Sequence, residues 1–128
     1  MSAIGTILFA HGVAHFMGLG SLGGPTSNWN LRSGLLERLD GNKTSTQIGG
    51  LLFTVCALGF MCAGIAWFDS LIPVRMWRPL TDASAILSTV TVLTFTRAFP
   101  PSFRYNVIAL IINALIIANW LQIIDWPV

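Results

Sequence analysis

The sequence predicts an all-α fold: an integral membrane four-helix bundle with a short interfacial helix between spans one and two. Of the 128 residues, 54% are hydrophobic and only 9% are charged, whereas an ordinary soluble domain carries roughly 25% charged residues. Four long stretches contain almost no charged residues, and turn or capping residues separate them. The surface of such a chain must face lipid, and the length suits a single domain.

The four uncharged stretches are expected to be the membrane spans of one transmembrane domain, residues 1–128. A helix needs roughly 20 apolar residues to cross about 30 Å of hydrocarbon. Backbone amides in lipid must bond within their own segment, which favours helices. The expected spans are about residues 2–24, 47–67, 79–97 and 104–124.

Residues at the ends of the stretches carry boundary signals. Thr44 and Gln47 have the spacing of a capping box ahead of the second span. Pro79 suits the first turn of the third span, and residues 100–101, both proline, break the chain before the fourth. Aromatic residues near the ends match interfacial belts: Trp67, Trp77, Trp120 and Trp126 on one side, and Phe99, Phe103 and Tyr105 on the other.

The longest loop, residues 25–45, has a helical pattern of its own. Leu31, Leu35, Leu36 and Leu39 recur at helical spacing with charged residues between them. This pattern predicts a short helix on the membrane surface. Residues 40–42, Asp-Gly-Asn, are expected to end that helix as a turn.

Basic residues give the orientation. Cytoplasmic loops carry an excess of Lys and Arg. One side of the expected bundle holds five basic residues and the other holds two. The protein is therefore expected in the plasma (inner) membrane, with loops 25–46 and 98–103 cytoplasmic and both termini outside. The five are Arg32, Arg38, Lys43, Arg97 and Arg104, and the two are Arg75 and Arg78.

Small residues predict how the helices pack, because close approach of backbones drives helix association in lipid. Each of the first two spans offers ridges of such residues, and these spans are expected to be tightly packed neighbours. The ridges are Ser2, Thr6, Ala10, Ala14 and Gly18 in span one, and Gly59 and Ala63, with Gly50, Ala57 and Gly64 at a seven-residue period, in span two.

Two histidines are the clearest candidates for chemistry. His11 and His15 are four residues apart, so they share one helix face near the middle of span one. A titratable group at that depth is costly and suggests function. Aligning the antiparallel spans by depth places hydroxyl and amide groups, and Cys56, at the same level, with Asp82 farther outward. The candidate ligand-binding or polar site comprises His11, His15, Asn113, Ser88, Thr89 and Asp82.

Several interpretations of the histidine pair stay open, and no catalytic residue is assigned. The imidazoles can bond to Asn, Ser or backbone groups and hold the bundle together. They can form a binding or acid/base site for a lipophilic molecule. His11 and His15 can hold one metal, although they supply only two ligands. A haem shared with another subunit is a further cofactor compatible with the pair, and neither cofactor is favoured.

The run His-Gly-Val-Ala-His-Phe-Met-Gly at residues 11–18 resembles the H-G-h-h-H start (h is apolar) of an uncharacterised group of small bacterial four-helix membrane proteins. Trp-Arg-Pro-Leu at residues 77–80 and Asn113 in the last span resemble the same group. The resemblance implies four spans and draws attention to His11 and His15, but it names no reaction. A weaker analogy, by size and helix number alone, is to DoxX-like membrane proteins.

The function favoured by these observations is an accessory or interaction subunit of a larger membrane complex. Small size, short loops and glycine ridges motivate it. The expected partners are the lipid bilayer and other membrane subunits or a second copy. A net charge of +2 without a Lys/Arg-rich run argues against nucleic acid. The alternatives are a bundle that binds or transforms a lipophilic molecule and a haem or metal subunit, so whether the protein is an enzyme stays open.

Overall fold

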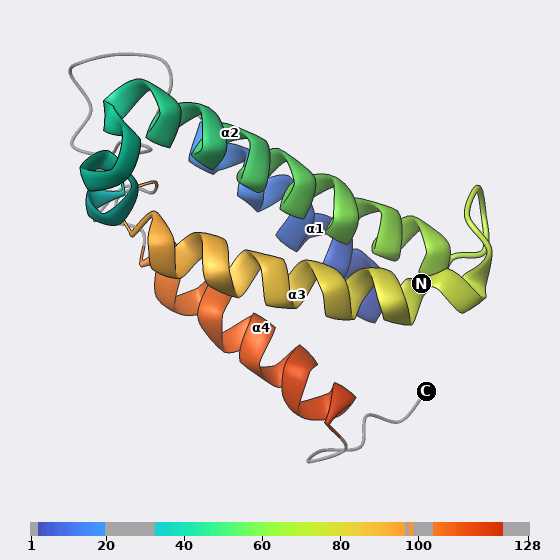
Figure 1. The fold of residues 1–128 in the computed structure, drawn as a ribbon. Coiled ribbons are helices and arrows are strands. Elements are labelled where there is room, and N and C mark those ends of the chain that lie inside the picture. The colour runs from blue at the N-terminus through green and yellow to red at the C-terminus, as the bar shows by residue number, and fades with distance from the viewer. Residues whose placement is uncertain (1–2, 20–32, 97, 99–103, 122–128) are drawn as a thin grey trace.

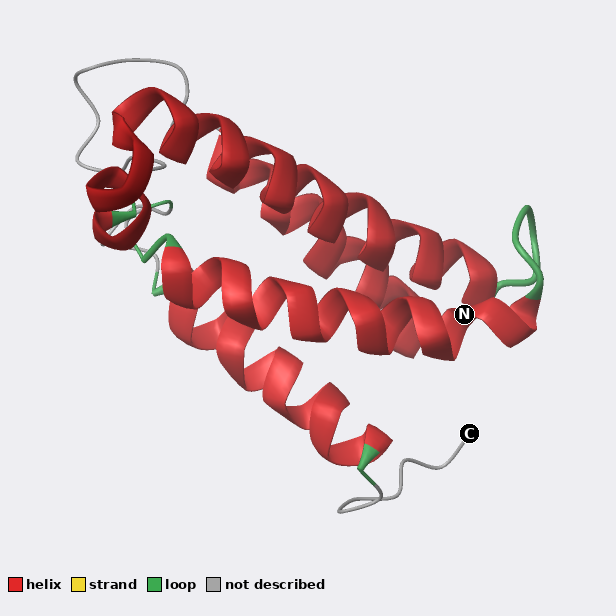
Figure 2. Ribbon diagram, viewed as in Figure 1, coloured by secondary structure: helices red, strands yellow, loops and turns green. Residues whose placement is uncertain are grey.

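The computed structural model describes residues 3–19, 33–96, 98 and 104–121, and these contain helices and no strand (Figures 1 and 2). Successive long helices run antiparallel. The start of α1 and the end of α4 lie at the same end of the molecule as the α2–α3 connection (Figure 1). The prediction of a helical bundle is therefore confirmed. The elements are α1 (Ala3–Phe16), α2 (Gly34–Trp67), the short 3-10 helix η2 (Val74–Met76), α3 (Trp77–Thr94) and α4 (Tyr105–Trp120).

Helix α2 differs from the prediction of a separate interfacial helix. Ser33 caps it by accepting a hydrogen bond from the Leu36 amide at 3.4 Å, and the helix then continues through residues 40–42. The expected turn there and the expected cap at Thr44 are therefore wrong. Yet the Ser33 amide donates to Ser45 Oγ at 3.0 Å, although a straight helix would separate these residues by about 18 Å.

The first turns of α2 must therefore fold back on the rest, and Figure 1 shows them at an angle to the main axis. Gly41 lies within the bent segment. The Asp-Gly-Asn sequence that was expected to form a turn thus does not end the helix. Leu31 and Arg32, which the sequence placed in the interfacial helix, lie outside the described residues.

Helices α1 and α2 approach each other backbone to backbone along a line that we call the glycine seam: Gly5 and Gly12 of α1 against Gly64 and Ala57 of α2. A Cβ atom added to Gly12 would lie 2.7 Å from the Ala57 carbonyl oxygen, and one added to Gly64 would lie 2.9 Å from that of Gly5. Both helices thus present small residues seven apart. The close packing of the first two helices is confirmed, and Ala57 and Gly64 of the seven-residue period expected for α2 lie at the contact.

The ridge expected on span one is wrong in its choice of residues. Thr6 and Ala10 are exposed, and Ala14 is only half-buried. Gly18 is buried, where an added Cβ would meet the Phe53 ring at 3.0 Å. The seam repeats every seven residues and not every four, because a four-residue step drifts around the helix by 40° each time.

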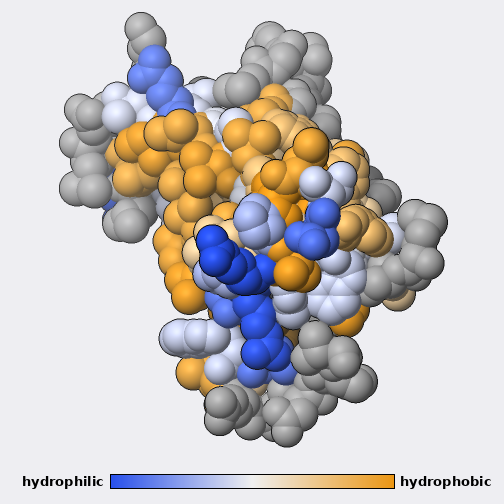
Figure 3. Space-filling view, turned by 90° about the vertical axis from the view of Figure 1, so that its right-hand side faces the viewer, coloured by the Kyte–Doolittle hydropathy of each residue, from blue (hydrophilic) through white to orange (hydrophobic). Residues whose placement is uncertain are grey.

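The helices expose apolar side chains and bury polar ones. Every exposed residue in 48–58 of α2, 83–93 of α3 and 107–115 of α4 is apolar. The buried polar residues include two histidines, an asparagine and several serines and threonines, and no charged side chain is buried in the described segments. Figure 3 looks onto the end with the α2–α3 connection and shows hydrophilic residues gathered there, with hydrophobic residues around them.

The helices differ in whether they are long and apolar enough to cross a membrane. Within the described segments, one helix is long and apolar enough to cross a membrane, over Thr44–Trp67 of α2. The apolar helices Ala3–Leu19 and Tyr105–Trp120 are shorter. Helix α3 begins at Trp77, whose ring lies against that of Trp67 with centroids 4.5 Å apart. These two tryptophans occupy one end of the bundle, whereas Phe99, Phe103 and Trp126 lie outside the described residues.

Candidate functional site

A layer of polar side chains crosses the middle of the bundle between two apolar clusters. We call it the polar layer: His11, His15, Tyr105, Asn113 and Ser88. All five side chains are at most 5% exposed, and His15, Asn113 and Ser88 have no exposed surface. The flanking clusters consist of Phe53, Val92, Phe95, Ala98 and Ala109, which also pack with Tyr105, and of Leu8, Phe60, Ala63, Ala85 and Ile116.

Hydrogen bonds connect α1, α3 and α4 through this layer. His11 Nε2 lies 3.3 Å from Asn113 Oδ1, and Asn113 Nδ2 donates to Ser88 Oγ at 2.8 Å. Ser88 Oγ lies 2.7 Å from His15 Nε2. His15 Nδ1 lies 3.0 Å from the carbonyl oxygen of His11, one turn earlier on the same helix. The bonds therefore return to the helix from which they start.

The partners determine where the protons lie. The His11 carbonyl oxygen can only accept, so His15 carries its proton on Nδ1 and its Nε2 accepts from the Ser88 hydroxyl. Asn113 Oδ1 likewise accepts, so His11 carries a proton on Nε2. Each donor in the circuit meets one acceptor when both imidazoles are neutral. The Asn113 amide joins the two histidines by donating on one side and accepting on the other.

Tyr105 is the member of the layer that the sequence analysis missed. Its hydroxyl lies 3.1 Å from His15 Nδ1 and 3.4 Å from the His11 carbonyl oxygen. The prediction that Tyr105 belongs to an interfacial belt, which rests on its place near the end of its span, is wrong because the side chain is buried in the layer. The available signal was helical spacing, since Tyr105, Ala109 and Asn113 recur every four residues on one face of α4.

Aromatic rings enclose the two imidazoles on the α2 side. The His11 ring lies 4.6 Å from the Phe60 ring and 4.8 Å from the His15 ring, both edge to face. The His15 ring also lies 5.5 Å from Phe60 and 6.2 Å from Phe53. Helix α2 therefore contributes an apolar wall to the layer. Its Cys56 lies at the same level but bonds elsewhere, with Sγ 3.8 Å from Thr91 Oγ1.

Two of the six predicted site residues lie away from the layer. Thr89 is half-buried, and its hydroxyl donates to the Ala85 carbonyl oxygen of its own helix at 2.8 Å. Asp82 is half-buried near the start of α3, where the nearby charge of Arg78 acts on it, and it has no contact with the layer in the described residues. The structure thus brings together His11, His15, Asn113 and Ser88 and separates Thr89 and Asp82 from them.

The donor set limits cofactor binding. The described residues contain no group of three or more His, Cys, Asp and Glu side chains that could hold a metal ion. Both nitrogens of His15 are engaged in hydrogen bonds. No hydrogen bond of His11 Nδ1 is found among the described residues, so this atom alone could become a ligand without breaking the circuit. One imidazole nitrogen falls short of the four ligands of a structural zinc site.

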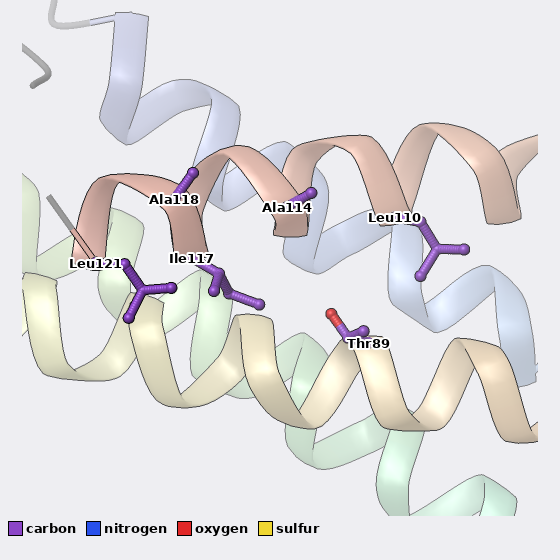
Figure 4. Close-up of a pocket in the computed structure, with 6 residues that line it drawn as sticks. All are labelled: Thr89, Leu110, Ala114, Ile117, Ala118 and Leu121. Atoms are coloured by element: carbon purple, nitrogen blue, oxygen red, sulfur yellow. The ribbon is translucent and has the colours of Figure 1, made fainter. Parts of the chain in front are cut away.

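A groove of about 320 Å³ lies between α3 and α4, away from the polar layer. Figure 4 shows Leu110, Ile117 and Leu121 directed from the α4 segment toward α3, and Thr89 directed from α3 toward α4. Apart from Thr89, whose hydroxyl is bonded to its own helix, the lining carries no polar side chain. It therefore offers apolar surface and no catalytic group. The lining residues are Thr89, Leu110, Ala114, Ile117, Ala118 and Leu121.

Comparisons of the chain with models of protein families, with curated proteins and with solved structures find no match. The resemblance to small four-helix membrane proteins stays a prediction, and the functional argument rests on the geometry above.

Proposed function

We propose that the protein is an integral membrane four-helix bundle that serves as an accessory or interaction subunit of a larger membrane complex. Its polar layer holds the helices together and carries out no chemistry. The observation that supports this role is the closed hydrogen-bond circuit, in which His11, Asn113, Ser88 and His15 use each other as partners.

Membrane insertion is supported by the distribution of polarity over the helices. The exposed side chains in the middle of α2, α3 and α4 are all apolar, and α1 exposes one polar residue, Thr6. The polar groups are buried and bonded to each other, which is the arrangement that lipid-embedded helices require. In the proposed topology all four helices cross the plasma membrane, and both termini lie outside.

Extraction and labelling test this placement. The full chain is expected to stay in the membrane pellet at alkaline pH. Single cysteines at Ser70, in the α2–α3 connection, and at Thr96, after α3, both of which are exposed, should react with a membrane-impermeant maleimide from opposite sides of the membrane. These variants carry Cys56→Ala and Cys62→Ala, so that native thiols give no signal. Release by alkaline washing, or labelling of both positions from one side, would refute the four-crossing topology.

The accessory role is supported by the state of the imidazoles. A catalytic or ligand-binding histidine needs a nitrogen that faces a substrate. Both nitrogens of His15 and Nε2 of His11 are bonded within the bundle, which leaves Nδ1 of His11, on a side chain that is 4% exposed. Each such bond contributes about 1 kcal/mol, or somewhat less between membrane helices. This is the energetic role expected of a group that fixes helix register.

Native membranes solubilised in mild detergent provide the test of the accessory role. The protein should migrate with a complex much larger than its own 13.9 kDa, and a His11→Gln/His15→Gln variant should keep that migration. A histidine-free variant that still assembles supports the structural role. A monomeric wild-type protein would exclude the accessory role, and a purified wild-type protein that contains haem or metal would replace it with the cofactor alternative.

A further inference from the structure

The groove between α3 and α4 is about as long as one leaflet of a bilayer is thick. Its α4 wall extends from Leu110 to Leu121, and the helix rises about 16 Å over that distance. The hydrocarbon of a bilayer is about 30 Å thick, so each leaflet supplies about 15 Å. The groove therefore matches the height that a single acyl chain occupies in one leaflet.

The hydrogen bond between Asn113 and Ser88 fixes the position of the groove along the bundle. These two residues belong to the polar layer and set the register of α4 against α3. At equal distances from that bond, α4 reaches Leu121 and α3 reaches Leu80, which lies in its first turn. The groove thus runs from about the middle of the bundle to the end with the α2–α3 connection (Figure 1).

The walls of the groove suit hydrocarbon and not water. Apart from Thr89, the lining side chains are Leu, Ile and Ala, and the Thr89 hydroxyl already donates to the Ala85 carbonyl oxygen. A water molecule in a cavity needs roughly two to four polar partners, and the described lining offers at most the oxygen of Thr89. In the proposed membrane placement, an apolar group must therefore fill this space of about 320 Å³.

The shape of the groove selects among apolar groups. Spread over a length of about 16 Å, a volume of about 320 Å³ forms a channel that is much narrower than a helix. A helix is about 10 Å across with its side chains, so a partner helix could lie over the groove but could not enter it. A single acyl chain, which is thin and flexible, fits inside.

Two charged residues of α3 lie on the groove side at its outer end. Arg78 and Asp82 precede Thr89 by three and two turns, which places all three within about 20° of one helix face. Helix α4 has no charged residue over 105–121. Arg78 is exposed, and Asp82 is half-buried one turn farther in. The charge of Arg78 acts on Asp82, but no ion pair of Arg78 is found within the described segments.

An exposed arginine at this place suits the phosphate of a phospholipid. The guanidinium carbon of Arg78 lies 5.6 Å from the centre of the Trp77 ring, and tryptophan near the end of a span is typical of the membrane interface. A guanidinium can donate two parallel hydrogen bonds to one phosphate. The Asp82 carboxylate repels an anion from the inner part of the groove, so the phosphate is held at the outer end and the acyl chain extends inward.

We propose that the α3–α4 groove binds one phospholipid, with an acyl chain between the two helices and the phosphate on Arg78. This inference rests on the proposed membrane insertion. In the proposed topology the bound lipid belongs to the outer leaflet. The groove would then be closed by lipid, and α4 would be held to the bundle by that lipid as well as by the polar layer.

Photo-cross-linking of the full chain in phospholipid vesicles tests the position of the acyl chain. The probe is a phosphatidylethanolamine with a diazirine at the end of one acyl chain, added as a minor component. Mass spectrometry should find adducts mainly at Thr89, Leu110 and Ala114, and far fewer at the exposed Val55 and Leu58 of α2. Ala114→Leu, which fills the groove, should remove this excess. Ala83→Leu, at an exposed position on another face of α3, is the matched control and should keep it.

The headgroup is tested at the outer end. Arg78→Gln should lower the yield of groove adducts about tenfold, because a charge-assisted contact with the phosphate is lost. Arg75→Gln is the matched control, since it removes an exposed charge from the same end of the bundle outside the groove. A diacylglycerol probe with the same chains and no phosphate should label the wild type as weakly as the phospholipid labels Arg78→Gln.

Equal labelling of the groove and of the α2 surface would overturn the inference, because lipids would then only surround the protein. Unchanged labelling of Ala114→Leu would also overturn it. Groove labelling that survives Arg78→Gln, or that diacylglycerol reproduces in full, would refute the phosphate contact. Each of these results leaves the accessory role intact if the solubilised protein still migrates with a large complex. Protein that failed to enter the vesicles would overturn both proposals.

Discussion

The two halves of the bundle hold their helices together by different means. Helices α1 and α2 meet along the glycine seam, where backbone lies against backbone over several turns. Helices α3 and α4 diverge, leave a groove between them, and connect with α1 through a few directional bonds in one layer. The first half should therefore respond to changes in side-chain volume, and the second half to changes in hydrogen-bonding chemistry.

The largest effect is expected from volume added to the seam. Gly12→Val places a branched side chain against the Ala57 carbonyl oxygen and the Met61 amide, which a Cβ alone would approach to 2.7 and 2.8 Å. Because backbone cannot move aside as a flexible side chain can, we expect the free energy of unfolding to fall by about 3 kcal/mol or more. Ala10→Val, at an exposed site on the same helix, is the control. Equal free energies of unfolding for the two variants in denaturant titration would contradict the close backbone packing along the glycine seam.

A chemical change in the polar layer ranks second. Asn113→Leu keeps most of the volume but removes both bonds of the amide, and it leaves His11 Nε2–H without an acceptor. The free energy of unfolding is expected to fall by about 2 kcal/mol, because two hydrogen bonds are lost and one buried donor is left unsatisfied. Adding His11→Leu removes that donor, so the double variant should lose less than the sum of the single variants. Strict additivity in this cycle would mean that the His11–Asn113 bond contributes nothing.

Tyr105→Phe is a smaller test of the same layer. It removes the hydroxyl that lies near both His15 Nδ1 and the His11 carbonyl oxygen but keeps the ring against its neighbours. Since His15 retains its bond to that carbonyl, we expect the free energy of unfolding to fall by about 1 kcal/mol. The same measurement on His15→Phe, which breaks the circuit, should show a larger loss. If His15→Phe left the free energy of unfolding unchanged, contacts other than the circuit would have to stabilise this half of the bundle.

The smallest effect is expected in the groove. Ala114→Leu adds volume between α3 and α4, where the space is already open. The free energy of unfolding should therefore change by no more than about 0.5 kcal/mol. The contrast with Gly12→Val is the sharpest form of the comparison between the two halves. A loss of 2 kcal/mol at Ala114 would show that the α3–α4 contact is as closely packed as the seam, and the distinction would fail.

Polarity and depth were enough to assemble most of the polar layer from the sequence. The predicted spans place polar groups of His11, His15, Ser88 and Asn113 at one level, and the proposed insertion into lipid would leave them few partners except each other. Depth alone does not distinguish Thr89 from Ser88, so the predicted site includes both. One residue corresponds to 100° around a helix, which turns Thr89 away from the histidines and toward the groove.

Features that depend on three-dimensional contact could not be read in the same way. Tyr105 has an aromatic ring, which suits a membrane interface, and a hydroxyl, which can bond inside the bundle. The sequence alone does not distinguish these two positions. The ridge expected on α1 has a period of four residues, whereas the contact with the partner helix selects Gly5 and Gly12, which are seven residues apart. The bend in α2 depends on the contact between Ser33 and Ser45 across twelve residues, which no local pattern encodes.

In the proposed membrane topology the hydrogen-bond circuit also has a consequence for biosynthesis, because its members would enter the membrane at different times. His11 is made first, Ser88 later and Asn113 last, whereas the seam needs only α1 and α2. The first two helices can therefore pair while the ribosome is still translating, and Ser88 can bond to His15 once α3 is in place. The Nε2–H group of His11, however, stays without its acceptor until α4 brings Asn113. A chain that stops short of α4 would present unsatisfied polar groups to lipid, which gives quality-control proteases a physical mark by which to tell unfinished copies from complete ones.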